Sequence, residues 1–283
     1  MSFIPLAEIL ALADAKRCAI VGCNVHNMEF AQGVVMAAEE LRSPVILMVA
    51  EPTIAFAGLE MISDICLHLA RRSSVPVSIL LDHGKTGATI EDCVRLGLSV
   101  MFDGSHLPYD ENIAQTRVFA RLAHGAGVSI EGELGALTGS EFGEEESVQL
   151  FTDAGQAATF VRETGVDALA ISIGNMHGLY KAPPRLDMAR LEAIHKLVDV
   201  PLVLHGGSDL PDDQVRIAVA NGIRKVNFGT DLRFAFFLTL RDRIASDATE
   251  FKPFTILAAA RSRIAEVVKH KIDVAGSSRL LGH

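Results

Sequence analysis

Three apolar stretches that end in histidine and glycine decide how this chain folds: SILLDHG (78–84), AISIGNMHG (170–178) and PLVLHGG (201–207). Each places one histidine (His83, His177 or His205) after a run that is typical of a buried strand. When buried parallel strands close into a barrel, their carboxyl ends meet at one rim. Three neutral imidazoles that converge there describe a catalytic divalent-metal site with an open coordination position. The pattern therefore predicts an enzyme.

Similar strand-like runs recur along the chain, with stretches of helical periodicity between them. We expect strands at residues 18–24, 44–50, 76–82, 99–103, 127–133, 168–174, 201–205 and 225–229. Alternation of eight strands with helices predicts an α/β fold, the (β/α)8 or TIM barrel. The alternative is a doubly wound open sheet. That fold would want a GxGxxG motif after the first strand, and VGCNVHN (21–27) is not that motif.

The chain is expected to form a single domain over residues 1–283, because no Pro-rich linker, internal repeat or low-complexity block divides it. Residues 135–152, GALTGSEFGEEESVQLFT, form a long polar loop after the fifth strand. A loop of this length inside a compact domain is usually functional or mobile. We expect the segment after residue 231 to be helical and VAGSSRLLGH (274–283) to be a flexible tail.

Composition limits the partners and the compartment. The net charge of −9 argues against nucleic acid or an anionic membrane surface as the main partner. The four cysteines have no CxxC spacing and lie among apolar residues, which favours reduced thiols in a cytoplasmic protein. Glu8 and Asp14 interrupt the first apolar stretch, so it predicts an amphipathic helix rather than a signal peptide. No apolar run is long enough to span a membrane.

Polar residues end nearly all of the predicted strands: Asn24, Asp82 with His83, Asp103, Glu133, His205 and Asn227. One such residue is usually a cap or a turn residue, but their repetition favours an active site at this rim. Asp82 could orient a neighbouring ligand or act as a general acid–base near the metal. Because adjacent strand residues point to opposite faces, Asp82 and His83 are not expected to chelate one ion together.

Two glycine-rich turns follow the seventh and eighth strands, where barrels commonly bind phosphate. They are HGGSD (205–209) and NFGTD (227–231). Their Gly206, Gly207, Ser208, Gly229 and Thr230 would supply backbone N–H and hydroxyl donors. Ordinary turns have the same composition, but the position of the first segment directly at a proposed metal ligand favours phosphate.

Taken together, LDHG, EGELGALTG, IGNMHG, PLVLHGGSDLP and KVNFGTD occur in family order within about residues 20–235. In this combination the chain resembles the class II, metal-dependent fructose- and tagatose-bisphosphate aldolases. The resemblance implies that His83, His177 and His205 hold one catalytic zinc ion, with Glu133 and Asp103 able to contact it in an alternative position. A monovalent cation is a further cofactor that this reading allows.

The resemblance also implies roles for the other site residues. Asp82 would exchange a proton with the oxygen at the cleaved carbon–carbon bond, while Asn24 and Asn227 would position the enediolate. Glu141, eight residues after Glu133, would move the proton at the nucleophilic carbon from a mobile loop. The residues that would hold the dihydroxyacetone-phosphate half are Gly178, Lys181, Gly206, Gly207, Ser208, Asn227, Gly229 and Thr230.

The chain departs from the family pattern at Asp209, where glycine is expected, and at Asn175-Met176 and Phe142. These departures concern the aldehyde half, so alternatives stay open. The first hypothesis is zinc-dependent, reversible cleavage of a fructose- or tagatose-1,6-bisphosphate-like ketose to dihydroxyacetone phosphate and an aldehyde. The alternatives are the same chemistry with a different aldehyde, and a non-catalytic barrel that binds sugar phosphates. A homodimer or homotetramer is expected.

Overall fold

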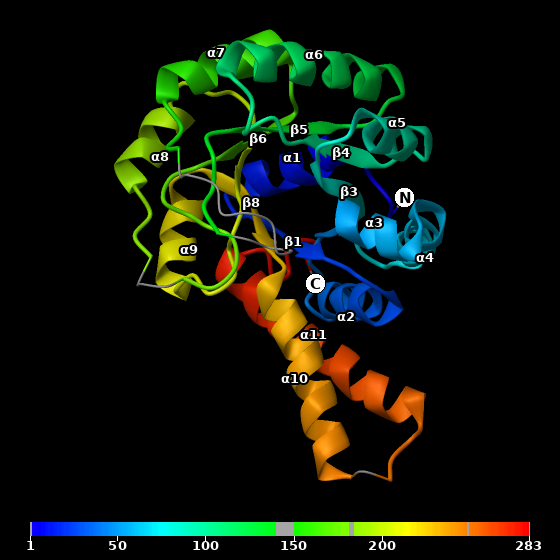
Figure 1. The fold of residues 1–283 in the computed structure, drawn as a ribbon. Helices are drawn as coiled ribbons and strands as arrows, with labels where there is room; N and C mark the ends of the chain where they lie inside the picture. Colours follow the sequence, from blue (N-terminus) through cyan, green and yellow to red (C-terminus); the bar gives the residue numbers. More distant parts are fainter. Residues whose placement is uncertain (1, 140–149, 181–183, 248, 283) are drawn as a thin grey trace.

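Eight parallel strands form a closed barrel in which each strand pairs with the next and β8 pairs with β1 (Figure 1). The computed structural model describes residues 2–139, 150–180, 184–247 and 249–282. The strands are β1 (Ile20–Asn24), β2 (Val45–Ala50), β3 (Val77–Gly84), β4 (Ser99–Phe102), β5 (Ile130–Leu134), β6 (Ala168–Ile171), β7 (Leu202–Leu204) and β8 (Ile223–Phe228). The barrel prediction is confirmed, and the open-sheet alternative is wrong.

Helices surround the barrel and follow the predicted periodic stretches (Figure 1). Within the described residues they are α1 (Leu6–Lys16), α2 (Met28–Glu40), α3 (Glu51–Ala57), α4 (Leu59–Arg72), α5 (Gly87–Arg95), α6 (Tyr109–Gly125), α7 (Ala154–Thr164), α8 (Met188–His195), α9 (Asp212–Ala220), α10 (Thr230–Ser246) and α11 (Pro253–Ala275). Alternate strand residues such as Val21 and Cys23 lie in the apolar layer between barrel and helices. Burial of this layer is the main driving force for the fold.

Helix α1 closes the amino-terminal end of the barrel. Leu6, Ile9 and Leu10 are buried in one apolar cluster with the barrel-lining side chains of Met48 and Met101. The first turn of α1 has no side-chain cap of its own. Instead, two hydroxyls at the starts of neighbouring strands accept its amide hydrogens: Leu6 N–H donates to Ser99 Oγ and Ala7 N–H to Ser129 Oγ, each over 3.0 Å. The barrel itself therefore caps the helix that plugs it.

The expectation of a flexible tail is wrong for residues up to 282, because the tail is bonded to the end of α2. Arg279 N–H donates to the carbonyl of Leu41 over 2.7 Å. Ser277 is buried and its hydroxyl accepts from Ser43 Oγ at 2.9 Å. Ser277 lies two residues beyond the end of α11, so hydroxyl pairing holds a segment whose composition alone suggests disorder.

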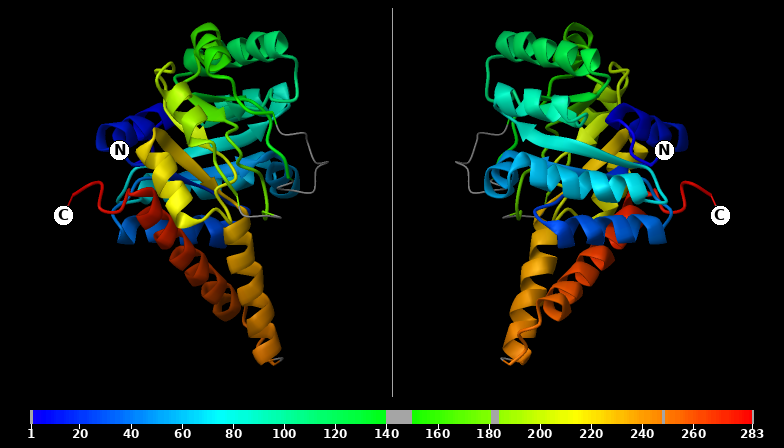
Figure 2. Two further views of the ribbon diagram at one scale, coloured as in Figure 1. Left: turned by 90° about the vertical axis from the view of Figure 1, so that its left-hand side faces the viewer. Right: turned by 90° about the vertical axis from the view of Figure 1, so that its right-hand side faces the viewer.

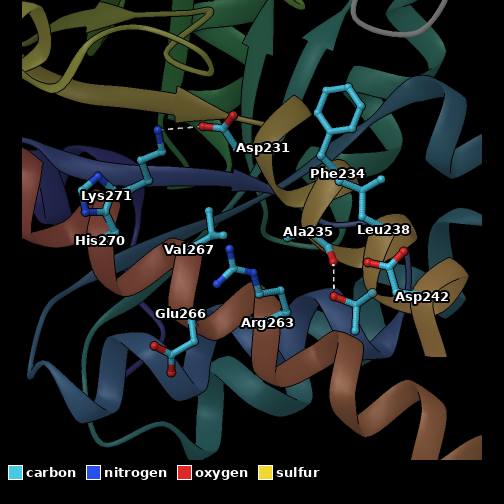
Figure 3. A pocket seen from close by; sticks show the side chains of 11 residues that line it. Asp231, Phe234, Ala235, Leu238, Asp242, Arg263, Glu266, Val267, His270 and Lys271 are labelled. Atoms are coloured by element: carbon cyan, nitrogen blue, oxygen red, sulfur yellow. Dashed lines mark hydrogen bonds and ion pairs between the residues drawn. The ribbon is translucent and has the colours of Figure 1, made fainter. Parts of the chain in front are cut away.

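Helices α10 and α11 extend beyond the barrel as a helical hairpin (Figure 2). Near the barrel the two helices are joined by the ion pair between Lys271 and Asp231, 2.7 Å apart (Figure 3). A groove between them is lined by charged residues of both signs and by apolar Phe234, Leu238 and Val267 (Figure 3). The hairpin starts directly after β8, at the rim where the strands end.

Among the described residues, no single helix has the length and apolar character needed to cross a membrane. The pair α3 and α4 passes that test only when joined across a 105° bend.

Candidate metal centre and active site

The three histidines singled out from sequence come together at the carboxyl end of the barrel. His83 lies near the end of β3, His205 directly follows β7, and His177 lies in the loop after β6. One nitrogen from each ring falls within 4.8 Å of the others. His83 Nε2 and His205 Nδ1 are 2.9 Å apart, so these two nitrogens face each other. The loop of His177 is held by a hydrogen bond from its backbone N–H to the carbonyl of Thr138.

His83 reaches this cluster because the strand alternation breaks at its position. Its φ is +48°, in the left-handed region, and the pairing of β3 with β4 shifts register between Leu81 and Gly84. Gly84 tolerates the close approach of the Met101 carbonyl, where a Cβ would lie within 2.6 Å. The expectation that Asp82 and His83 point to opposite faces is therefore wrong. The groups of side chains that could hold an ion contain His83 but not Asp82, and whether the two share an ion stays a prediction.

Asp103 holds the outer nitrogen of His83. His83 Nδ1 and Asp103 Oδ2 are 2.8 Å apart, and the other carboxylate oxygen accepts from the amide and the hydroxyl of Ser105. Burial would raise the pKa of Asp103, but the hydrogen bond and charge of His83 outweigh it and hold that pKa far below its usual range. Burial likewise opposes charging of His83, yet Asp82 and Asp103 raise its pKa well above 6.5. The outer nitrogen is thus occupied, and Nε2 is left to face the cluster.

Glu133 approaches the same nitrogen of His83 as Asp103 does, and the three residues form a second possible metal group. Glu133 Oε2 is 3.6 Å from His83 Nδ1. Burial and the nearby carboxylate of Asp103 raise the pKa of Glu133 well above its ordinary value. A carboxyl that is destabilised as an anion would gain from a cation placed beside it. The two residues that the resemblance gave for an alternative metal position therefore do lie together.

Asp82 lies between the two asparagines. Asn24 Nδ2 donates to Asp82 Oδ2 at 2.7 Å, and Asn227 Nδ2 lies 3.5 Å from Asp82 Oδ1. The same Asn227 nitrogen lies 3.2 Å from His205 Nε2. All three side chains are buried, so the carboxylate is held in one orientation beside the histidines. A fixed, buried carboxylate next to a metal site suits general acid–base chemistry.

Sequence reasoning missed two charged residues directly beneath the histidines, Glu131 and Lys225. Glu131 Oε1 is 2.8 Å from His205 Nε2, and Glu131 Oε2 accepts from Lys225 Nζ at 2.7 Å. Burial alone would raise the pKa of Glu131, but Lys225 and His205 lower it to about 2. The signal was present in the strand period of two. Glu131 and Glu133 share one face of β5, and Lys225 and Asn227 share one face of β8.

The proposed phosphate cradle lies where β7 and β8 end. Gly229 precedes α10 and provides no side-chain cap, so the positive end of that helix faces this turn. Ser208 and Thr230 are buried there, and the Asp231 amide donates to Ser208 Oγ at 3.3 Å. One predicted donor is already used, because Gly207 N–H donates to the carbonyl of Asn227. Gly206 and Gly178 both have positive φ.

Two departures from the family pattern have structural explanations. Asp209 has a φ of +62°, which glycine adopts most easily, and its carboxylate accepts from the Tyr180 amide at 3.0 Å. Asn175 is buried and its amide group bonds with the Ile173 N–H and the His205 carbonyl. Asn175 therefore ties two rim segments together. Glu141, Phe142 and Lys181 lie outside the described residues.

The histidine cluster passes a chemical test for a metal. In His83 and His205 one ring nitrogen is engaged by a carboxylate, Nδ1 by Asp103 and Nε2 by Glu131, which leaves the other ring nitrogen as ligand. Three convergent imidazole nitrogens on an otherwise buried rim fit a divalent transition metal. A closed parallel barrel with such a site at the carboxyl ends of its strands defines a (β/α)8 enzyme of the metal-binding kind.

Comparison with known proteins narrows this class. The family model described as "Fructose-bisphosphate aldolase class-II" matches residues 4–279. The D-tagatose-1,6-bisphosphate aldolase subunit GatY of Klebsiella oxytoca is 39% identical over 279 residues, covering 98% of each protein. A fructose-bisphosphate aldolase of Thermus caldophilus is 36% identical over 296 residues, covering 95% of this chain and 97% of that protein. The crystal structure of the YdjI aldolase from Escherichia coli K12 superimposes with a TM-score of 0.85 at 30% identity, covering 98% of both chains.

The chain belongs to the class II fructose-bisphosphate aldolase family. It is an aldolase, a lyase that cleaves a phosphorylated ketose at a carbon–carbon bond, in a family that depends on a metal ion. This assignment confirms the resemblance drawn from the sequence.

Proposed function

We propose that this aldolase reversibly cleaves fructose- or tagatose-1,6-bisphosphate, or a close analogue, to dihydroxyacetone phosphate and an aldehyde. The observation that carries the proposal is the convergence of three imidazole nitrogens within 4.8 Å. Asp82 lies beside them, in contact with Asn24 and within 3.5 Å of Asn227. The named relatives at 39% and 36% identity support this substrate class.

In this proposal His83, His177 and His205 hold one zinc ion, and Asp103 and Glu133 offer an alternative position. The three-nitrogen ligand set is typical of catalytic zinc. When bound, the ion supplies Lewis-acid polarisation of the substrate ketone. A monovalent cation is kept as a further cofactor in this proposal, and activity in sodium, potassium and large organic cations is the comparison that tests it.

The residues of the chain carry the proton transfers. In cleavage, Asp82 accepts the proton of the hydroxyl at the carbon that becomes the aldehyde, and the adjacent carbon–carbon bond breaks. The electron pair of that bond stays on the ketone half of the substrate. The side-chain amides of Asn24 and Asn227 orient this half. Glu141, which lies outside the described residues, then returns a proton to the ketone-half carbon. Asn24 also keeps Asp82 in its acceptor orientation, as their 2.7 Å contact indicates.

The phosphate of the ketone half binds at the start of α10 in this proposal. Gly206, Ser208, Gly229 and Thr230 form this turn, with Gly207 shaping it. Gly178 belongs to the neighbouring loop, and Lys181 lies outside the described residues. The aldehyde half is open, so the alternative of a different aldehyde is kept. The family assignment favours catalysis over a non-catalytic sugar-phosphate-binding barrel.

Metal removal and a ligand substitution test the proposal. Dialysis against a chelator should abolish cleavage, and zinc should restore it. His205→Ala should lose metal and cleavage together, whereas His195→Ala, on α8, should keep both. Metal content by elemental analysis and a panel of aldehydes with dihydroxyacetone phosphate give the readouts. Retention of one ion per chain in His205→Ala would show that the site is misassigned.

We propose further that two copies associate through the α10–α11 hairpin. Phe237, Phe251 and Phe254 are 61%, 83% and 74% exposed on it. Large apolar side chains that gather on a projecting element usually mark an interaction site. The mixed charges of the adjoining groove suit a self-complementary protein surface more than a small ion (Figure 3). Phe254→Asp should lower the molar mass measured by light scattering, and an unchanged mass would exclude this interface.

We place the protein in the cytoplasm. The support is its four free, buried cysteines, a usage that fits a reducing compartment. Cell fractionation of the native host with an antibody to the chain is the direct test.

A further inference from the structure

A lysine and a glutamate form an ion pair inside the barrel, next to apolar lining residues such as Met101 and Val203. Lys225 of β8 and Glu131 of β5 are both 0% exposed, and Lys225 Nζ lies 2.7 Å from Glu131 Oε2. Strands β5 and β8 are not neighbours in the barrel, so the pair crosses its interior. Gly22 of β1 faces the same interior space, where a Cβ would lie 2.8 Å from Met48 Sδ, 2.9 Å from Asn227 Oδ1 and 3.4 Å from Lys225 Cε.

Such a pair is poorly explained by stability. Desolvation of two charges can exceed their mutual attraction, and apolar residues of similar volume are often as stabilising. The barrel already uses that solution at neighbouring interior positions, because Met101 and Val203, the register partners of Glu131 and Lys225, belong to an apolar cluster. A different requirement must therefore keep the charges at this level.

The second oxygen of Glu131 supplies that requirement. Glu131 Oε1 lies 2.8 Å from His205 Nε2, so the carboxylate accepts the hydrogen of that nitrogen. A neutral imidazole carries one hydrogen, and placing it on Nε2 leaves Nδ1 as the lone-pair nitrogen. Nδ1 is the atom that faces His83 Nε2 at 2.9 Å. Asp103 makes the equivalent contact for His83, but from the rim.

We infer that the Glu131–Lys225 pair is a positioning device that selects Nδ1 of His205 as the metal-binding nitrogen and strengthens metal binding. A carboxylate that accepts from a ligand imidazole makes that ligand more basic. Lys225 balances the buried charge of Glu131, and it fixes the oxygen that His205 does not use. The inference rests on the proposed function, because it takes His205 to be a metal ligand.

The test separates the charge of the pair from its packing. In Glu131→Gln with Lys225→Met, the side-chain lengths and an acceptor for His205 remain while both charges are removed. We expect this double variant to fold and to bind zinc roughly 10- to 100-fold more weakly, the range for lost partners of metal ligands. Its cobalt-substituted form should show a shifted visible absorption spectrum. Each single variant leaves one buried charge unpaired, so its metal-free form should melt at a lower temperature than the double variant.

Arg224→Met is the matched control. Arg224 also lies on β8, but its guanidinium pairs with Asp14 of α1 at 2.7 Å. Loss of this charge should leave zinc affinity, measured by competition with a chromogenic chelator, at the wild-type value. Wild-type affinity and an unchanged cobalt spectrum in the double variant would overturn the inference, because the pair would then only fill space.

If the double variant does not fold, Glu131→Asp tests the inference instead. This variant keeps both charges but shortens the acidic side chain by one methylene. Roughly tenfold weaker zinc binding is expected there if the contact with His205 matters, and unchanged binding contradicts it. The failures are distinguishable. Metal retained in His205→Ala removes the proposed site, whereas metal lost there but held normally by the pair variants removes only the positioning role.

Discussion

The two ends of this barrel are built from the same eight strands, yet they differ in nearly every chemical respect. At the amino-terminal end, α1 seals the interior with Leu6, Ile9 and Leu10, and the hydroxyls of Ser99 and Ser129 cap that helix. At the carboxyl end the interior holds Glu131, Lys225 and further buried charges, and no helix covers it among the described residues. Inward-facing residues of one strand pass from apolar to charged within two positions, as Leu80 and Asp82 do.

Stability and chemistry are therefore separated along the strands. The plugged end contributes burial of apolar area, which drives folding. The open end concentrates carboxylates and imidazoles whose pKa values depart from their ordinary values, at an expense in stability that the rest of the barrel offsets. Substitutions at the two ends should therefore affect different measurements.

The largest effect is expected from Asp82→Ala. The variant loses the proposed proton acceptor but keeps the three histidines, so it should bind one metal ion per chain. Cleavage should fall by roughly a hundredfold or more, the scale of general acid–base catalysis. Steady-state kinetics with metal analysis measures both quantities. Near-normal cleavage by metal-loaded protein would remove Asp82 from the mechanism.

Leu10→Ala should have the opposite effect: it should lower stability and leave catalysis unchanged. Leu10 is fully buried between α1 and the barrel interior. Its truncation should lower the free energy of unfolding by about 2–5 kcal/mol, the range for a buried leucine that leaves a cavity. The kcat/KM of the folded protein should stay unchanged, because the site lies at the other end. Denaturant unfolding and kinetics on the same preparation check this, and a matching fall in kcat/KM would show that the two ends are coupled.

Ser129→Ala should give the smallest change. It removes the hydroxyl that accepts from the Ala7 amide and should lower the free energy of unfolding by about 0.5–2 kcal/mol, as for a lost helix cap.

Ser105→Ala is the matching variant at the other end of the barrel, because Ser105 donates a hydrogen bond to Asp103 beside His83. That variant should alter zinc affinity and leave unfolding nearly as in the wild type. Equal losses in the free energy of unfolding for both variants would contradict the separation of stability and chemistry between the two ends of the barrel.

Much of the fold was predictable because the parallel strands of a barrel are short runs of apolar residues that can be recognised in the sequence. All eight expected strands overlap the observed ones, and the errors are at their edges, such as β6, which ends at Ile171 rather than residue 174. The histidines could be placed at one rim because strand ends converge there. Their roles as ligands remain a prediction, as do those of Glu141 and Lys181.

The rest could not be reached by local pattern alone. The inward turn of His83 depends on a positive φ and a register shift with β4, which its own sequence does not announce. Lys225 and Glu131 are 94 residues apart, and their pairing follows only from barrel closure. Asn175 and Asp209 looked like substrate-related departures, yet the structure uses both to hold rim loops in place.

The spacing of the histidines along the chain has a consequence for how the enzyme is made. His83 and His205 are 122 residues apart, and the carboxylate behind His205 is held by a lysine on the last strand. During synthesis the chain emerges from its amino terminus, so β8 leaves the ribosome after every proposed ligand. A nascent chain thus holds His83 long before it can offer a preformed cluster. Binding of the proposed ion at a preformed cluster therefore requires that the barrel has closed first.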